Sequence, residues 1–153
     1  MVRAAIALGS NLGDRQAALQ DAVDQLAGRL DDLAVSDFID TEPEGVGAQP
    51  RFLNAAAVGG WEGGARPLLD LLMAIEQAAG RERPYPGAPR TLDLDLILLG
   101  PAVVDEPGLV VPHPRFRERG FVLAPLSQIA PDLVDPVTGC TVAELYQSWR
   151  VKR

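Results

Sequence analysis

The segment at residues 91–99 constrains the fold most, because it reads Thr-Leu-Asp-Leu-Asp-Leu-Ile-Leu-Leu and so alternates apolar and acidic side chains. Successive side chains of a strand point to opposite faces of a sheet. The leucines are expected to share the face that packs into the core: Leu92, Leu94, Leu96 and Leu98. Asp93 and Asp95 share the opposite face, with backbone positions about 6.5–7 Å apart. The segment therefore predicts a half-buried strand with one acidic side.

Two carboxylates that face the same way on one strand repel each other, and a hard divalent cation between them removes that repulsion. Mg²⁺ is commonly held by one or two carboxylates together with substrate phosphates. We therefore expect Asp93 and Asp95 to bind metal. The alternative is an exposed strand whose acids are only solvated, although aspartate is depleted in strands. The Asp-x-Asp spacing alone does not specify one enzyme.

The apolar periodicity of the rest of the chain predicts an α+β fold. We expect, in chain order, a strand at 2–8, a helix at 14–30, one strand at 33–40, a strand at 52–61, a helix at 67–79, the strand at 91–99, a hairpin at 102–111, a Pro-interrupted helical region at 115–130 and a helix after Thr141. The order β-α-β-β-α-β is that of the ferredoxin-like arrangement, a mainly antiparallel sheet covered by helices on one face, here with C-terminal additions. A chain of 153 residues is expected to form one domain over 1–153.

Local signals place the ends of several elements. Asp14 is the expected N-cap of the first helix, with Ser10 as a competing cap. Pro67 is expected to open the second helix, where its missing N–H costs nothing, and Gly80 to end it. A capping box is expected at the start of the last helix: Thr141 with Glu144.

The charges are distributed unevenly. The formal net charge is −7, yet 13 of the 14 basic residues are arginine. Six of them fall in two clusters: Arg81, Arg83 and Arg90, then Arg115, Arg117 and Arg119. Arginine presents a planar fork of donors that suits phosphate oxygens. The clusters indicate a local anion site, and surface ion pairing with the acidic majority is the alternative.

Composition excludes several classes of function. An acidic chain is a poor candidate for nonspecific nucleic-acid binding. The sequence contains no run of about 18 apolar residues, so no membrane span is predicted. No Gly-x-x-x-x-Gly-Lys-Ser/Thr motif occurs, so the chain is not a P-loop enzyme. A single cysteine, Cys140, without a signal peptide predicts a cytoplasmic protein. A single histidine, His113, excludes a histidine-rich metal site.

Two further segments carry candidate ligand-binding residues. Thr41 and Glu44 precede Phe52 and Asn54, whose ring and amide suit a flat heteroaromatic ligand with an amide-like edge. The alternative is that Phe52 is a core residue and Asn54 caps a turn. His113 lies between two prolines and is suited to bind phosphate, although a lone histidine is more often structural.

Four motifs in this order resemble the 6-hydroxymethyl-7,8-dihydropterin pyrophosphokinase family over nearly the whole chain. They are Ala-Leu-Gly-Ser-Asn-Leu-Gly-Asp at 7–14, Gln-Pro-Arg-Phe-Leu-Asn-Ala at 49–55, Pro-Arg-Thr-Leu-Asp-Leu-Asp-Leu at 89–96, and Val-Pro-His at 111–113 with Arg-Gly-Phe-Val-Leu-Ala-Pro-Leu at 119–126. The resemblance implies that ATP and the hydroxymethyl dihydropterin give AMP and the pterin diphosphate, a step of folate biosynthesis. We also expect a monomer that binds no nucleic acid or membrane.

The same resemblance implies a role for each candidate residue. Two Mg²⁺ ions would be held by Asp93 and Asp95. The pterin would stack between Phe52 and Phe121, with its edge bonded by Asn54 and by the backbone near Thr41 and Glu44. The triphosphate or nucleotide would be contacted by Glu76, Arg81, Arg83, Arg90, Leu96, His113 and Arg119. Arg81 and Arg90 are the expected catalytic arginines beside the two aspartates.

The chain departs from the family pattern at three places. Glu42-Pro43-Glu44 replaces a more apolar segment, and Phe52 stands where tyrosine is frequent. The loop around Tyr85 is one residue short and lacks a tryptophan, and Tyr85 is a candidate replacement for that ring. Two alternatives stay open, a noncatalytic ferredoxin-like binding module and another Mg²⁺-dependent phosphoryl or nucleotidyl transferase. Product analysis separates them from the pyrophosphokinase.

Overall fold

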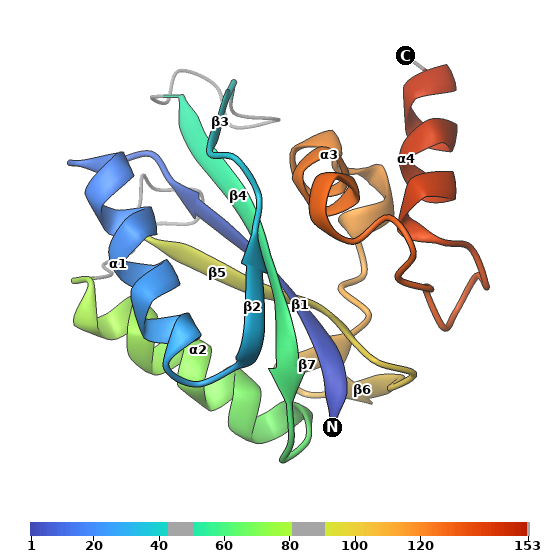
Figure 1. The fold of residues 1–153 in the computed structure, drawn as a ribbon, viewed down its shortest axis with the longest axis horizontal. Coiled ribbons are helices and arrows are strands. Elements are labelled where there is room, and N and C mark those ends of the chain that lie inside the picture. The colour runs from blue at the N-terminus through green and yellow to red at the C-terminus, as the bar shows by residue number, and fades with distance from the viewer. Residues whose placement is uncertain (43–50, 81–90, 153) are drawn as a thin grey trace.

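The computed structural model describes residues 1–42, 51–80 and 91–152. Its elements follow one another as in Figure 1: β1 (Val2–Ser10), α1 (Arg15–Ala27), β2 (Asp31–Val35), β3 (Ile39–Thr41), β4 (Phe52–Trp61), α2 (Ala65–Ala78), β5 (Asp93–Leu99), β6 (Val104–Glu106), β7 (Leu109–Val111), the short 3₁₀ helix η1 (Phe116–Glu118), α3 (Gly120–Ile129) and α4 (Val142–Val151). In this part of the chain, no helix combines the length and the apolar character needed to cross a membrane.

The main sheet has the strand order β2-β4-β1-β5, with β3 also paired to β4, and every pairing is antiparallel. This order and the two helices between the strands confirm the ferredoxin-like core. β6 and β7 form the separate hairpin expected at 102–111. Gly9 on central β1 lies opposite both Asn54 on β4 and Asp93 on β5, so these three residues form one row across the sheet.

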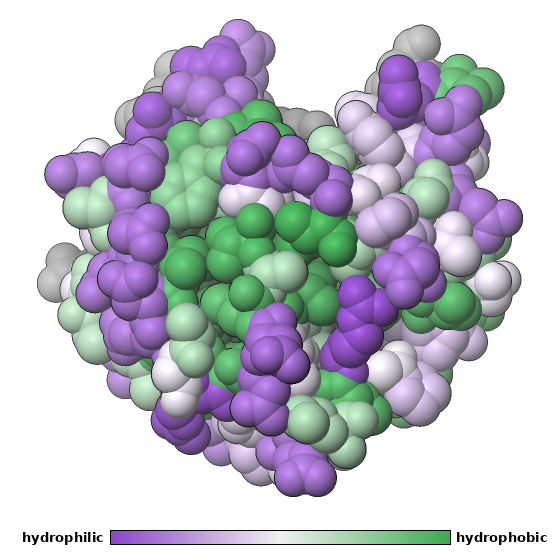
Figure 2. All heavy atoms as spheres, viewed as in Figure 1, coloured by the Kyte–Doolittle hydropathy of each residue, from purple (hydrophilic) through white to green (hydrophobic). Residues whose placement is uncertain are grey.

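Two apolar cores lie on the two faces of this one sheet. Helices α1 and α2 cover one face as expected, with Leu19, Leu26, Leu68 and Leu72 fully buried. Burying one such side chain stabilises the fold by roughly 1.5–3 kcal/mol. The C-terminal additions cover the opposite face, where α3 packs on β4 and α4 packs on α3 (Figure 1). Figure 2 shows hydrophobic residues at the centre of the face that carries β2, with hydrophilic residues around them.

Most of the predicted element ends are confirmed. The Asp14 side chain caps α1 by accepting from Ala17 N–H at 3.0 Å, whereas Ser10 ends β1. Gly80 follows α2 at φ +79°, a conformation that favours glycine. The capping box of α4 is present. The predicted start of α2 is wrong by two residues: the helix begins at Ala65, and Pro67 lies in the first turn, where N–H groups lack intrahelical acceptors.

The predicted single strand at 33–40 is wrong, because the chain forms β2 and β3 there. Val35 pairs with Ala57 and Ile39 pairs with Asn54, so four steps along this segment match three steps along β4. One extra residue therefore lies between the two strands, beside Ser36, whose N–H and Oγ bond the backbone of Ala56. The extra residue reverses the side-chain alternation and turns β3 toward the face that α3 covers.

The predicted face of Leu98 is also wrong. A β-bulge in β5 places Leu98 opposite Ala5 and Leu96 opposite Ile6, which leaves Ile97 as an extra residue. Leu92, Leu94 and Leu96 pack under α1 and α2 as expected, but Leu98 packs on the α3 side. The bulge frees the Ile97 carbonyl, which accepts from His113 N–H at 3.0 Å. The C-terminal part of the chain is thereby bonded to β5.

Candidate active site

The two predicted metal ligands lie together on the α3 side of β5. Asp93 and Asp95 are half-buried, and they alternate with Leu94 and Leu96, which point into the opposite core. Across the ladder, Asp93 faces Gly9 and Asp95 faces Ala7. These small neighbours leave room above the strand for a ligand. The expected arrangement of the two carboxylates on one face is confirmed.

The donor set fits Mg²⁺ and no all-protein metal cage. Two carboxylates supply hard oxygen ligands, and Mg²⁺ uses one or two of them while water and substrate phosphates complete its octahedron. Among the described residues, no group of three or more histidine, cysteine, aspartate or glutamate side chains could hold a metal ion. The pair is therefore suited to a cation that arrives with a phosphate substrate.

A polar and aromatic row crosses the sheet beside these carboxylates. Phe52 and Asn54 lie on the same face of β4, with Gly9 of β1 next to them. A Cβ built on Gly9 would lie 3.1 Å from Asn54 Oδ1 and 3.6 Å from the Phe52 ring. A Cβ at position 9 would therefore crowd Asn54 and make ordinary contact with Phe52. The sequence gives Gly9 only as part of the motif at 7–14, and the register of β1 and β4 was needed to place it in this row.

Asn54 is buried and held by its neighbour on β3. Its Nδ2 donates to Thr41 Oγ1 at 2.5 Å, and the residue is only 5% exposed. The extra residue between β2 and β3 creates this contact, because it turns Thr41 to the face of Asn54. The alternative that Asn54 caps a turn is wrong, since Asn54 lies within β4. The structure thus brings Thr41, Phe52 and Asn54 together as predicted.

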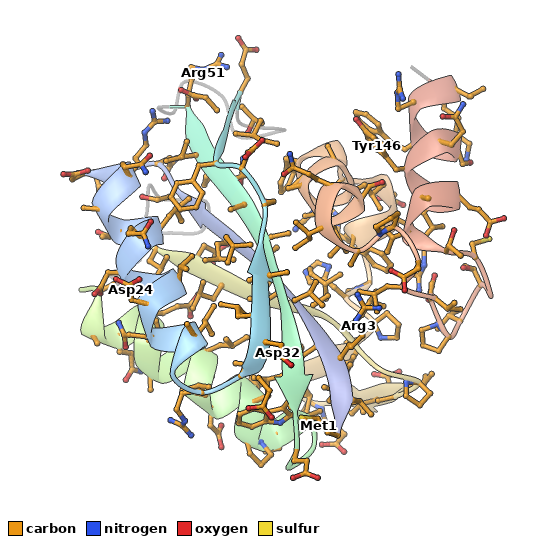
Figure 3. All side chains as sticks on the ribbon, viewed as in Figure 1. Met1, Arg3, Asp24, Asp32, Arg51 and Tyr146 are labelled. Atoms are coloured by element: carbon orange, nitrogen blue, oxygen red, sulfur yellow. The ribbon has the colours of Figure 1, made fainter. Side chains whose placement is uncertain are left out.

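Ion pairs between two arginines and one aspartate lie at the edge of this row. The Asp40 carboxylate on β3 accepts from Arg15 on α1 and from Arg51 just before β4, at 3.0–3.3 Å. Hydrogen bonds from Arg15 and then Arg51 hold the pKa of Asp40 below its usual value. Figure 3 shows Arg51 at this end of the sheet. The network ties α1, β3 and β4 together next to Thr41.

His113 is a neutral hydrogen-bond donor beside Asp93. Its Nδ1 accepts from Arg115 N–H at 3.2 Å, so the neutral imidazole carries its hydrogen on Nε2. Burial, and after it the charge of Arg119, lower the pKa of His113 to about 4, although the Asp93 carboxylate acts to raise it. The charges of both Arg119 and Asp93 therefore act on one imidazole. Asp93 thus comes together with His113 and Arg119, which follow it by at least 20 residues in the sequence.

Arg119 and Phe121 begin α3 on the same side of the sheet as Phe52. Arg119 is the N-cap residue, and its guanidinium lies 5.6 Å from the centre of the Phe121 ring. Both side chains are half-buried. Phe121 packs against the core under α3. Rings from β4 and from α3 thus approach the same region from two elements.

Glu76 and Leu96 lie on the other side of β5. Glu76 is 3% exposed on α2, and its Oε2 accepts from Leu94 N–H at 2.7 Å. That bond joins α2 to the strand that carries the two aspartates. The Leu96 side chain is buried in the core under α1 and α2, so only its backbone is available to a ligand. The predicted residues Glu44, Arg81, Arg83 and Arg90, like Tyr85, lie outside the described residues.

Fold and site together define a class of protein. A ferredoxin-like sheet here carries two carboxylates on one strand, with a neutral histidine and an arginine beside them. An aromatic ring and an amide lie next to these groups. This combination is typical of a metal-assisted phosphoryl transferase that binds a flat ring. Residues 5–131 match the family of 7,8-dihydro-6-hydroxymethylpterin-pyrophosphokinase. The chain belongs to this family.

Similar proteins agree with that assignment. The chain is 43% identical over 134 residues to the 2-amino-4-hydroxy-6-hydroxymethyldihydropteridine pyrophosphokinase of Pseudomonas aeruginosa, which covers 86% of this chain and 82% of the relative. It is 39% identical over 150 residues to the enzyme of the same name from Bacillus subtilis, covering 96% and 90%. The crystal structure of wild-type HPPK-DHPS from Plasmodium falciparum has the same fold, with a TM-score of 0.78 at 12% identity. The match covers 99% of this chain but 45% of that one.

Proposed function

We propose that the α3 side of the sheet binds both substrates and positions them for the family's reaction. The chain is an ATP-dependent pyrophosphokinase of folate biosynthesis, which transfers diphosphate from ATP to 6-hydroxymethyl-7,8-dihydropterin. One observation carries the location of the site: Asp93 and Asp95 face the same side of the sheet as Phe52 and Asn54. Phosphate ligands and pterin ligands are therefore adjacent.

The pterin side of the site is assigned to five residues. Phe52 and Phe121 supply ring faces for stacking, which suits a flat bicyclic substrate. The Asn54 amide is fixed by Thr41 and presents a donor and an acceptor to an amide-like ring edge. The backbone near Glu44 is predicted to bond the pterin edge. Gly9 belongs beside them, because it lets a ring approach the sheet closely.

The nucleotide side is assigned to donors from the C-terminal part of the chain. His113 offers Nε2–H and Arg119 a planar fork, and both suit phosphate oxygens. Arg81, Arg83 and Arg90 are predicted to bind the same triphosphate, with Arg81 and Arg90 closest to the reacting phosphorus. Glu76 and the backbone of Leu96 are predicted to lie near the nucleotide.

Asp93 and Asp95 would hold Mg²⁺, and we propose two ions. When bound, the metal neutralises charge on the phosphate oxygens and helps to orient them. The hydroxymethyl oxygen attacks the β-phosphorus in line and forms the new O–P bond, while the bond from the β-phosphorus to the α–β bridging oxygen breaks and AMP leaves. Phe52, Phe121 and Asn54 hold the attacking arm, and His113 and Arg119 hold the phosphates. Positioning of this kind supplies much of the rate in phosphoryl transfer.

The assay is product analysis with ATP, Mg²⁺ and the reduced pterin. We expect AMP and the pterin diphosphate in equal amounts, with turnover that requires Mg²⁺. ADP as the product would indicate a kinase that transfers one phosphate, and free pyrophosphate would indicate a nucleotidyl transferase. No product at all would favour the noncatalytic binding module.

Three coarser expectations accompany this function. The described residues form two cores on one shared sheet, which supports a single domain over 1–153. The monomeric state stays a prediction, and light scattering across a concentration series would test it. The cytoplasmic location stays a prediction that rests on the single cysteine.

A further inference from the structure

The loop between α3 and α4 contains a buried carboxylate that has no place among the candidate substrate ligands. The Asp135 side chain has no exposed surface, and it accepts from Val137 N–H at 3.0 Å and Thr138 Oγ1 at 2.8 Å. Its backbone is bonded as well, from Asp135 N–H to the Cys140 carbonyl and from Gly139 N–H to the Asp135 carbonyl. The loop therefore holds this carboxylate in one place.

The carboxylate binds an arginine of η1 with both oxygens. Arg117 Nε donates to Asp135 Oδ2 at 2.5 Å and Arg117 Nη2 donates to Oδ1 at 2.9 Å. Burial acts to raise the pKa of Asp135, but the hydrogen bonds from Arg117, Thr138 and Val137 outweigh it and hold the pKa below its usual value. The Arg117 guanidinium also lies 4.9 Å from the centre of the buried Phe116 ring. A bidentate ion pair of this kind fixes the orientation of the arginine as well as its position.

The arginine lies between two candidate phosphate ligands. His113 precedes η1, and Arg119 follows it directly as the N-cap of α3. Arg119 N–H donates to the Phe116 carbonyl at 3.2 Å, and the Arg119 carbonyl accepts the first backbone bonds of α3. The orientation of η1 therefore determines the direction in which Arg119 leaves the backbone.

A second contact holds the same short segment from α4. Trp149 Nε1 donates to the Glu118 carbonyl at 3.2 Å. A Cβ built on Gly120 would lie 2.3 Å from the Trp149 ring, so the ring packs directly on the start of α3. The segment from η1 to α3 is thus fixed by a charge pair on one side and by an aromatic ring on the other.

We propose that Asp135 is a positioning residue for the pyrophosphokinase reaction, acting through its bidentate pair with Arg117 to hold η1 and aim Arg119 at the nucleotide phosphates. The inference rests on the proposed function, which assigns Arg119 to those phosphates. Asp135 touches no substrate in this scheme. Its effect is preorganisation, and a misplacement of about 1 Å at a phosphate ligand can cost about 100-fold in rate.

The test compares Asp135→Asn with a matched control in the same loop. Asparagine keeps the shape but points an N–H₂ group at a guanidinium N–H, which breaks the bidentate pair. The control is Asp132→Asn, which removes an exposed ion pair at 3.0 Å to Arg3 on β1 (Figure 3) and leaves η1 untouched. Calorimetric Kd values for a nonhydrolysable ATP analogue with Mg²⁺ and for the pterin are measured well below the unfolding temperature.

We expect Asp135→Asn to raise the Kd for the ATP analogue and the KM for ATP by about tenfold or more. Pterin affinity should fall much less, because Phe52 and Asn54 belong to β4 and only Phe121 follows the displaced segment. The control should change neither affinity. A lower melting temperature with both affinities intact, or an equal loss of both, would mean that the pair is only structural and would overturn the inference.

A second variant covers the case in which Asp135→Asn does not fold. Arg117→Lys keeps the positive charge but loses the planar fork, so the ion pair survives without its fixed orientation. We expect the same loss, selective for the ATP analogue and smaller in size. Unchanged ATP affinity in folded Arg117→Lys would contradict the proposal.

Arg119→Ala separates this inference from the proposed function. A loss of ATP affinity in Arg119→Ala combined with unchanged affinity in Asp135→Asn would overturn the inference alone. Unchanged ATP affinity in Arg119→Ala would overturn both. In the double variant, Asp135→Asn should add little to the loss caused by Arg119→Ala, because both act through one side chain. Full additivity would exclude a path through Arg119.

Discussion

At the scale of single residues, the acidic pair on β5 is the proposed metal site. Asp95→Asn removes one proposed metal ligand, so we expect turnover with Mg²⁺ to fall by about 100-fold or more. The same change relieves repulsion with Asp93, so the melting temperature should not fall. Steady-state kinetics and a thermal melt measure the two effects. Asp105→Asn, on exposed β6, is the control and should behave as the unchanged protein.

Three outcomes would contradict that assignment. Near-normal Mg²⁺-dependent turnover in Asp95→Asn would exclude the carboxylate as a metal ligand. Failure of Asp95→Asn to fold would mean that the residue has a structural role. Asp105→Asn losing activity would show that any loss of surface acid has this effect.

The positions of some candidate residues in the site could be predicted from the sequence, and those of others could not. Asp93 and Asp95 were predictable, because two-residue alternation is a local property of a strand. Gly9 was not, because only its pairing with Asn54 across β1 and β4 shows that a Cβ there would lie 3.1 Å from Asn54 Oδ1. Local patterns predict which face a side chain takes, whereas close approach depends on a partner strand.

At the scale of elements, β4 and α3 each contribute one aromatic ring to the proposed pterin site. Phe52→Ala and Phe121→Ala each remove one ring face, and a ring contact is worth about 0.5–1.5 kcal/mol beyond burial. We therefore expect pterin affinity to fall by about tenfold or more in each variant, with ATP-analogue affinity changed much less. The control is Phe38→Ala, because Phe38 is also half-buried but packs against the core under α1 and α2. Equal losses for both ligands would indicate general collapse of the site.

The start of α3 gives a second prediction at this scale. In Gly120→Ala the new methyl group would lie 2.3 Å from the Trp149 ring, so the ring must move. Overpacking of this kind costs about 1–3 kcal/mol, which chemical denaturation would measure, and displaced Trp149 should emit at longer wavelength. Trp149→Phe assigns the signal, because the other tryptophan, Trp61, is buried elsewhere. Gly28→Ala is the control, since its Cβ would meet nothing closer than 3.6 Å. An unshifted emission spectrum in Gly120→Ala would contradict the contact.

Single inserted residues explain why the faces of strand side chains were predicted less well than the starts of helices. Caps such as Asp14 and Thr141 are set by neighbours within three residues, and both were predicted. The extra residue after Val35 and the bulge at Ile97 reverse the alternation without any change in the local apolar pattern. Their positions are set by pairing with β4 and β1. Both lie close to the candidate site, where they orient Thr41 and hold the backbone of His113.

At the scale of the whole molecule, the two faces of the sheet have separate tasks. The face under α1 and α2 is apolar core, and the expected β-α-β-β-α-β order predicted it. The opposite face carries the candidate ligands, and the C-terminal additions supply His113, Arg119 and Phe121 there. Sequence could predict these additions as helical, but not that they would fold back over the second face. That placement depends on long-range contacts such as the one from His113 N–H to Ile97.

The acid stability of the whole molecule should report His113. Its pKa is about 4 in the folded state against 6.5 in the unfolded chain, because burial disfavours the charged form. Between these values the unfolded chain binds a proton that the folded protein does not, so the free energy of unfolding falls as the pH falls from 6.5 to 4. Asp135 titrates elsewhere: its pKa is lowered below 3.8, so its contribution is lost only under more acidic conditions. Urea unfolding of metal-free protein at several pH values should therefore show a slope between pH 4 and 6.5 that His113→Gln reduces and Asp135→Asn leaves in place. His113 is the only histidine in the chain, so its imidazole resonances give the folded pKa directly. A measured pKa near 6.5, or an unchanged slope in His113→Gln, would show that the imidazole is not held neutral by its surroundings.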